Sequence, residues 1–157
     1  MTSTEKTSVL FVCLGNICRS PMAEAVFRHV VTSRGLSDRF VIDSAGTAGY
    51  HVGDSPDPRS VATCRKNGVP VSHSGQKVNK EDFSRFDYIL CMDESNLADL
   101  KRLQPTRTKA KVSLFGDFDP KGDRIIKDPY YGGQDGFDRN YAQVVRCSEG
   151  FLKSLGV

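Results

Sequence analysis

The sequence predicts an α/β fold in which a parallel sheet is covered by helices on both faces. Short apolar runs alternate with amphipathic segments along the 157 residues. The apolar runs suit strands that are buried on both faces. Because strands that alternate with helices usually build a parallel sheet, the pattern favours this architecture over a sandwich or a helical bundle. We expect residues 1–157 to form one domain, with residues 1–7 flexible.

The first half of the chain contains two expected strands. Ser8–Cys13 is a short apolar run, and a helix follows in which Pro21 fits the first position. Apolar residues recur every four positions in this helix, and Gly35 supplies a stop signal. Phe40–Ser44 reads as the second strand. A long loop with the sequence AGTAGYHVGDSP then leads away from the sheet.

The next elements are bounded by capping residues. Asp57 and the proline after it open a helix that ends at Gly68. The run YILCM, Tyr88–Met92, is a third buried strand, and Asp93 can cap the helix that follows it. Pro105 closes that helix because proline cannot continue it.

The chain ends with a fourth strand and a long helix. Lys111–Phe115 is the strand, and the loop after it runs through DPYYGG. Apolar side chains at helical spacing between Phe137 and Leu155 predict the last helix.

Composition excludes several functional classes. A net charge of +3 is too small to indicate a nucleic-acid-binding protein. No apolar run approaches the roughly 20 residues of a membrane span, and no signal peptide is recognisable. Five cysteines, an odd number, suggest reduced thiols and a cytoplasmic protein. A metal site is not expected, because Cys13 and Cys18 form the one close cysteine pair. We expect a monomer.

The segment VLFVCLGNICRSP, residues 9–21, carries the strongest chemical signal. A junction between a strand and a helix aims backbone N–H groups and a helix N-terminus at one point, which suits an anion. Cys13 and Arg19 would frame that point, and the arginine fork matches two oxygens of a phosphate. Gly15 and Asn16 tolerate the left-handed backbone that a tight cradle needs.

Cys13 is placed to attack phosphorus. The thiolate is the nucleophilic form of cysteine, and the Arg19 guanidinium and the helix end both favour this anion. A hydroxyl donor from Ser20 adds support. Neither a nucleotide P-loop nor a dinucleotide fingerprint is present, because the G-K-[ST] and G-x-G-x-x-G patterns are missing.

Asp128 in DPYYGG is the candidate proton donor. Cleavage of a phosphate ester needs a proton for the leaving oxygen and then a base for the attacking water, and one carboxyl group can do both. Tyr130 and Tyr131 lie beside it, where their rings can hold an aromatic leaving group. Asp128 would meet Cys13 at the carboxyl edge of the sheet, where such folds bind ligands.

The sequence resembles the low-molecular-weight protein tyrosine phosphatase (acid phosphatase) family over nearly its whole length. The matching segments are VLFVCLGNICRSPMAEAVF, FVIDSAGT, SPDPRSV, FDYILCMDESNL, DPYYGG and VVRCSEGFL. The resemblance implies a flavodoxin-like, doubly wound, four-stranded parallel sheet and hydrolysis without a metal or cofactor. It implies a phosphocysteine on Cys13, transition-state binding by Arg19, and general acid and base catalysis by Asp128.

The same resemblance implies the remaining site residues. The phosphate-binding loop would contain Leu14, Gly15, Asn16, Ile17, Cys18 and Ser20, supported by Ser44 and His73. The substrate pocket would contain Tyr50, His51, Tyr130 and Tyr131, with Leu14 and Ile17 as walls. Substrates would be phosphotyrosine proteins and small phosphate monoesters, and inorganic phosphate would be product and inhibitor. A reversible Cys13–Cys18 disulfide and phosphorylation of Tyr130 and Tyr131 are further implications of the resemblance.

Three alternatives remain at this stage. A thiol-coupled arsenate reductase has a similar loop but needs a further cysteine pair, whereas Cys91 stands alone in its strand. A non-catalytic phosphotyrosine-binding module is expected to lack the nucleophile, the arginine or the acid, and all three are present. Arginine phosphate is a possible substrate, although aromatic walls fit this flexible, cationic group poorly.

Overall fold

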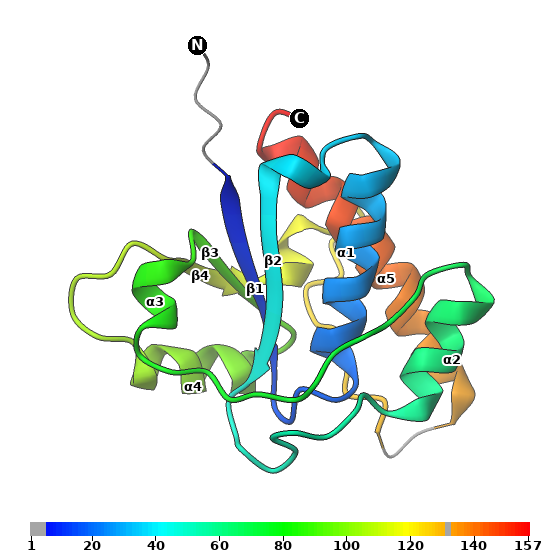
Figure 1. The fold of residues 1–157 in the computed structure, drawn as a ribbon, viewed down its shortest axis with the longest axis horizontal. Coiled ribbons are helices and arrows are strands. Elements are labelled where there is room, and N and C mark those ends of the chain that lie inside the picture. The colour runs from blue at the N-terminus through cyan, green and yellow to red at the C-terminus, as the bar shows by residue number, and fades with distance from the viewer. Residues whose placement is uncertain (1–5, 131–132) are drawn as a thin grey trace.

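The computed structural model of this chain, which describes residues 6–130 and 133–157, contains a four-stranded parallel sheet (Figure 1). The strands are β1 (Thr7–Cys13), β2 (Phe40–Gly46), β3 (Tyr88–Cys91) and β4 (Lys111–Leu114), in the order β2-β1-β3-β4. The chain runs from β1 outward to β2 and then returns past β1 to β3. This reversal makes the carboxyl end of β1 the topological switch point, where ligands bind in such sheets.

Helices cover both faces of the sheet (Figure 1). One face carries α1 (Arg19–Ser33) and α5 (Gln134–Ser154), and α2 (Pro58–Lys66) packs against both of these helices. The short α3 (Asp82–Arg85) and α4 (Glu94–Leu103) lie on the other face. Two short 3-10 helices complete the described elements, η1 (Ser37–Arg39) and η2 (Phe115–Phe118).

The core consists of two apolar layers, one on each side of the sheet. Phe11 in β1 packs edge-on against Phe27 and Phe115, with ring centroids 5.6 and 4.9 Å apart. Leu10 and Val12 point to the opposite layer, between the sheet and α4. Every side chain of β1 after Thr7 is therefore buried, which confirms the prediction from its apolar run.

The predicted caps are present. The Asp57 carboxylate accepts a hydrogen bond from the N–H of Arg59 at the start of α2. Asp93 and Asn96 form a reciprocal capping box at the start of α4. Both caps fix the point where a loop turns into a helix, and both lie at the edge of the sheet that carries the candidate site.

Several predicted boundaries were inaccurate: β2 ends at Gly46 rather than Ser44, β3 at Cys91 rather than Met92, and β4 at Leu114 rather than Phe115. Helix α1 begins at Arg19 rather than at Pro21, because the Cys18 carbonyl already accepts the first helical hydrogen bond from Met22. The missing N–H of Pro21 then falls at the third position, where a helix has no internal acceptor for it anyway. Helix α3 was not expected, since its four residues are too few for a periodic pattern. No helix of the described residues is long and apolar enough to cross a membrane.

Candidate active site

A cavity of about 240 Å³ opens at the carboxyl edge of the sheet, between β1 and the N-terminus of α1. The strand–helix junction at its floor is called the anion loop below and comprises residues 13–20. The cavity is lined by Cys13, Leu14, Gly15, Ile17, Cys18, Arg19, Tyr50, His51, Asp128 and Tyr130. The structure therefore brings together the predicted nucleophile, arginine and acid, from parts of the chain up to 115 residues apart (128 − 13).

The backbone of the anion loop turns its N–H groups toward the cavity. The carbonyls of Cys13, Leu14 and Ile17 accept hydrogen bonds of 2.9, 3.0 and 2.8 Å from backbone N–H groups outside the loop. In a trans peptide the C=O and the following N–H point in opposite directions. The next N–H groups therefore point inward, and together with the positive end of α1 they form a site for an anion.

Asn16 has the left-handed backbone that the loop requires. Its φ is +59°, and it is one of two described residues other than glycine with a positive φ. We expected this conformation of Gly15 as well, but Gly15 lacks it. A Cβ at this position would lie 2.9 Å from the His51 ring, so a larger residue would have to displace that side chain. Both residues thus serve the loop, for different physical reasons.

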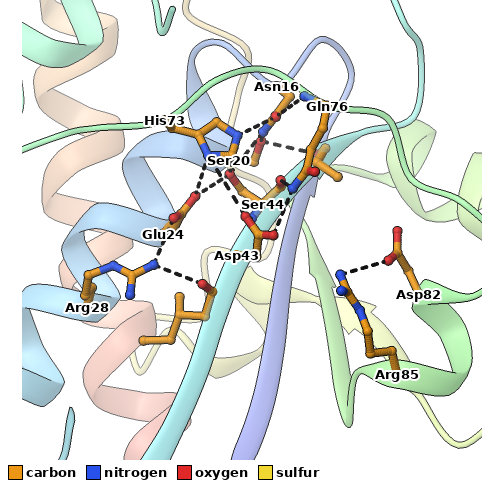
Figure 2. Close-up of polar contacts among 12 residues, drawn as sticks. Asn16, Ser20, Glu24, Arg28, Asp43, Ser44, His73, Gln76, Asp82 and Arg85 are labelled. Atoms are coloured by element: carbon orange, nitrogen blue, oxygen red, sulfur yellow. Dashed lines mark hydrogen bonds and ion pairs between the residues drawn. The ribbon is translucent and has the colours of Figure 1, made fainter. Parts of the chain in front are cut away.

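The Asn16 amide connects the anion loop to two other segments, β2 and the loop of residues 73–76 (Figure 2). Its Oδ1 accepts hydrogen bonds from the backbone N–H of Gln76, at 2.9 Å, and from Nε2 of His73, at 2.7 Å. Its Nδ2 donates to Ser20 Oγ at 2.8 Å and to Ser44 Oγ at 3.1 Å. A backbone N–H can only donate, so the Gln76 contact fixes the orientation of the amide. All four hydrogen bonds hold the loop in one shape.

A buried carboxylate supports this network from α1 (Figure 2). Glu24 accepts a hydrogen bond of 2.6 Å from Ser44 and lies 3.2 Å from Nδ1 of His73. Arg28 donates to its other oxygen at 2.9 Å. Glu24, Asp43 and His73 are the one group of three described side chains with potential metal-ligating atoms within 4.8 Å of one another. Because Glu24 already satisfies three partners, we assign this group to support of the loop.

Ser20 lies directly beside the candidate nucleophile. Its Oγ is 3.1 Å from Cys13 Sγ. Since the hydroxyl oxygen accepts from Asn16, its proton is left for the sulfur or for the Ala45 carbonyl, which lies farther away at 3.5 Å. The network therefore places a hydroxyl group within hydrogen-bond distance of Cys13.

Arg19 is buried, and its guanidinium is oriented by two acceptors. Nη1 donates to Asp93 at 2.6 Å and to the Ile126 carbonyl at 3.0 Å. Burial alone would lower the pKa of Arg19, but the charges of Cys13 and Asp93 outweigh burial and raise the pKa. The guanidinium thus stays charged at the cavity floor, with Nη2 3.7 Å from Asp128.

Asp128 lies at the cavity mouth with its side chain 40% exposed. Its Oδ1 accepts a hydrogen bond of 3.0 Å from the N–H of Tyr130. The rings of Tyr50 and Tyr130 are exposed beside it, as expected for the walls of a pocket for an aromatic group. The prediction for Tyr131 lies outside the described residues.

The remaining cysteines do not form a disulfide relay. All five cysteines are free, and Cys91 is buried in β3. Burial raises the pKa of Cys64, Cys91 and Cys147 to about 12, so these thiols stay protonated at neutral pH. Burial and the neighbouring Asp57 carboxylate also raise the pKa of Cys18. The arrangement gives no support to the arsenate reductase alternative.

Four residues of the site were not identified from the sequence. Glu24 and Gln76 support the anion loop, and Asp57 and Arg59 connect it to the segment of Asp128. Glu24 follows Ser20 by one helical turn, which could have indicated that it faces the loop. For the other three, no local pattern signals the tertiary contact.

Comparison with known proteins agrees with this geometry. A family model described as low molecular weight phosphotyrosine protein phosphatase matches residues 8–157. The human protein of that name is 52% identical over 155 residues, which cover 98% of each chain.

Solved structures of phosphatases share the fold of this chain. A protein tyrosine phosphatase from Entamoeba histolytica superposes with a TM-score of 0.93 at 38% identity, covering 96% of this chain and 97% of that one. A Drosophila arginine phosphatase superposes with a TM-score of 0.88 at 40% identity, covering 95% and 98%.

Proposed function

Since the chain belongs to the low molecular weight phosphotyrosine protein phosphatase family and is thus a phosphoric monoester hydrolase, we propose that Cys13 is its nucleophile. In this proposal Arg19 and the anion loop bind the phosphoryl group, and Asp128 transfers protons. The observation that carries the proposal is the convergence of these three side chains on one cavity.

In the first step, the Cys13 thiolate attacks the phosphorus of a bound monoester in line with the ester oxygen. An S–P bond forms and the P–O ester bond breaks, while protonated Asp128 gives its proton to the departing oxygen. The equatorial oxygens receive hydrogen bonds from Arg19 and from the inward N–H groups of the loop. These donors are fixed before the reaction by Asp93 and Asn16, so little reorganisation is needed in the transition state.

In the second step, the Asp128 carboxylate takes a proton from water, which attacks phosphorus. The P–S bond breaks, inorganic phosphate forms, and Cys13 leaves as a thiolate. The Ser20 hydroxyl, 3.1 Å from this sulfur, stabilises the departing anion. Asp128 ends the cycle protonated, as it began it.

The substrate we propose is phosphotyrosine in proteins, together with small aryl phosphates. Two exposed tyrosine rings beside the cavity suit a flat aromatic leaving group. Inorganic phosphate is proposed as product and inhibitor, because it fits the same donors. We further propose that the protein is cytoplasmic, which the five free thiols favour. We also propose that it is a monomer.

The test compares a phosphotyrosine peptide, the matching phosphoarginine peptide and arsenate as substrates. We expect turnover of the phosphotyrosine peptide that is abolished in Cys13→Ser and falls about a hundredfold in Asp128→Ala. A higher kcat/KM for the phosphoarginine peptide than for the phosphotyrosine peptide would make arginine phosphate the substrate class. The comparison is included because a structural neighbour from Drosophila with the same fold is named an arginine phosphatase. Binding of phosphotyrosine without turnover would contradict catalysis altogether.

A further inference from the structure

Arg59, in the first turn of α2, connects Asp57, which is hydrogen-bonded to the anion loop, with Tyr130, which lines the cavity. Its guanidinium is held by the Asp57 carboxylate in a two-point contact, with Nε–Oδ1 and Nη2–Oδ2 distances of 3.1 and 3.0 Å. Nη2 also donates to the backbone carbonyl of Tyr130 at 3.0 Å. The cation lies over the rings of Tyr130 and Phe137, 5.5 and 4.8 Å from their centroids. Arg59 is not among the residues that line the cavity.

Asp57, which holds Arg59, is attached to the anion loop. Its backbone N–H donates to the Ile17 carbonyl at 2.8 Å, and its carboxylate accepts a long contact of 3.8 Å from the Cys18 thiol. The residue is 8% exposed, so its carboxylate has little water available as an alternative partner. Hydrogen bonds from Arg59 lower the pKa of Asp57, which keeps the pair ionised. One end of the connection is therefore fixed to the loop that carries Cys13.

The other end reaches the proton donor. Asp128 belongs to a segment without regular secondary structure, and its side chain is 40% exposed. The shortest polar contact recorded for its carboxylate within the described residues is with the N–H of Tyr130, at 3.0 Å. The Arg19 guanidinium is more distant, at 3.7 Å. The position of the carboxylate thus depends on the backbone of Tyr130, whose carbonyl is held by Arg59.

We propose that Arg59 is a positioning residue that sets the placement of Asp128 relative to the phosphoryl group, through the chain Ile17–Asp57–Arg59–Tyr130. This role rests on the function proposed above. A lysine cannot replace the arginine, because a single ammonium cannot make the two-point contact with Asp57 and reach the Tyr130 carbonyl in the same plane. Proton transfer depends on placement, and a shift of about 1 Å costs up to roughly a hundredfold in rate.

The test uses two substrates that differ in their need for a proton. Phenol is a poor leaving group, with a pKa near that of tyrosine at about 10, whereas difluoromethylumbelliferone leaves readily as an anion. In Arg59→Gln and Arg59→Lys we expect kcat/KM for phenyl phosphate to fall about tenfold relative to the activated ester. This ratio does not depend on how much of the enzyme is folded, so it separates positioning from loss of stability. Arg65→Gln, at an exposed position on the same helix, is the matched control and should keep the ratio.

A double variant identifies the route of the effect. If Arg59 acts through Asp128, the variant Arg59→Gln/Asp128→Ala should be no slower on phenyl phosphate than Asp128→Ala alone. An unchanged substrate ratio in Arg59→Gln, or multiplicative losses in the double variant, would overturn the positioning role. Those results would leave the proposed function intact, because that function is tested separately, by turnover of phosphotyrosine in the wild type and its loss in Cys13→Ser and Asp128→Ala.

Discussion

Replacement of Asn16 tests how the shape of the anion loop is maintained. The residue is 1% exposed, has a φ of +59° and makes four hydrogen bonds. Asn16→Gly removes the amide but accepts the backbone conformation. Asn16→Ala removes the amide and also places a Cβ in the left-handed region. The two variants therefore separate the hydrogen bonds from the backbone strain.

The expected cost follows from the partners that lose a hydrogen bond. The hydroxyls of Ser20 and Ser44 keep other partners, so their loss is small. The N–H of Gln76 loses its acceptor, and Nε2 of His73 retains only the longer contact of 3.3 Å with Ser44, while Nδ1 keeps its contact with Glu24. Gln76 is exposed and His73 is half-buried, so each lost hydrogen bond costs about 0.5–1.5 kcal/mol, and Asn16→Gly should destabilise the protein by about 1–3 kcal/mol. Asn16→Ala should cost about 1–2 kcal/mol more, since that is the cost of the left-handed conformation in a residue with a Cβ.

The assay is urea unfolding of the three proteins, followed by kcat/KM for an aryl phosphate under conditions where each is folded. Activity should fall in both variants, because Ser20 loses the donor that orients its hydroxyl toward Cys13. Equal stability of the alanine and glycine variants would refute the backbone strain. Wild-type stability of the glycine variant would refute the role of the amide.

Three further results are expected. Iodoacetate at neutral pH should label Cys13 and spare the other four thiols, because burial raises their pKa values. Peptide mapping that finds Cys13 and Cys18 labelled equally would contradict this selectivity. Gly150→Ala should destabilise the protein by about 1–3 kcal/mol, because the added Cβ would lie 1.9 Å from the Phe118 carbonyl oxygen. Gly133→Ala is the control, since a Cβ added there meets no atom within 4 Å. Equal melting temperatures of the two variants would show that the close contact at Gly150 has no cost. Hydrogen bonds from Arg59 lower the pKa of Asp57, so its ionic stabilisation is complete above the ordinary carboxyl pKa of about 3.9 and is lost as pH falls through the lowered value. Asp57→Asn should consequently lose more stability at pH 7 than at pH 3, and an equal loss at both would exclude an ionic contribution.

The sheet and the meeting of Cys13, Arg19 and Asp128 at one cavity could be predicted because their signals are local. The apolar run of β1 and the capping aspartates mark element boundaries within a few residues. In a parallel sheet the carboxyl ends of the strands meet at one edge, so Cys13 and Asp128 could be placed together without knowing any side-chain contact.

The supporting residues could not be predicted in the same way. Gln76 reaches Asn16 across 60 residues, and Arg59 reaches Tyr130 across 71. Neither contact produces a periodic or capping pattern in the sequence, because each depends on how two distant segments pack against each other. Gly15 shows the same limit, because the side chain that a Cβ at this position would approach belongs to His51, in another loop.

Both proposed steps of catalysis depend on a phosphocysteine at Cys13. The most direct measurement is acid quenching of the enzyme during turnover of an aryl phosphate, followed by peptide mass spectrometry to locate the phosphoryl group. Asp128→Ala is a useful background, because loss of the base slows hydrolysis of the intermediate. We expect a phosphoryl group on Cys13 that disappears when the substrate is removed before the quench. Turnover with no phosphorylated peptide, or with the phosphoryl group on another residue, would contradict it.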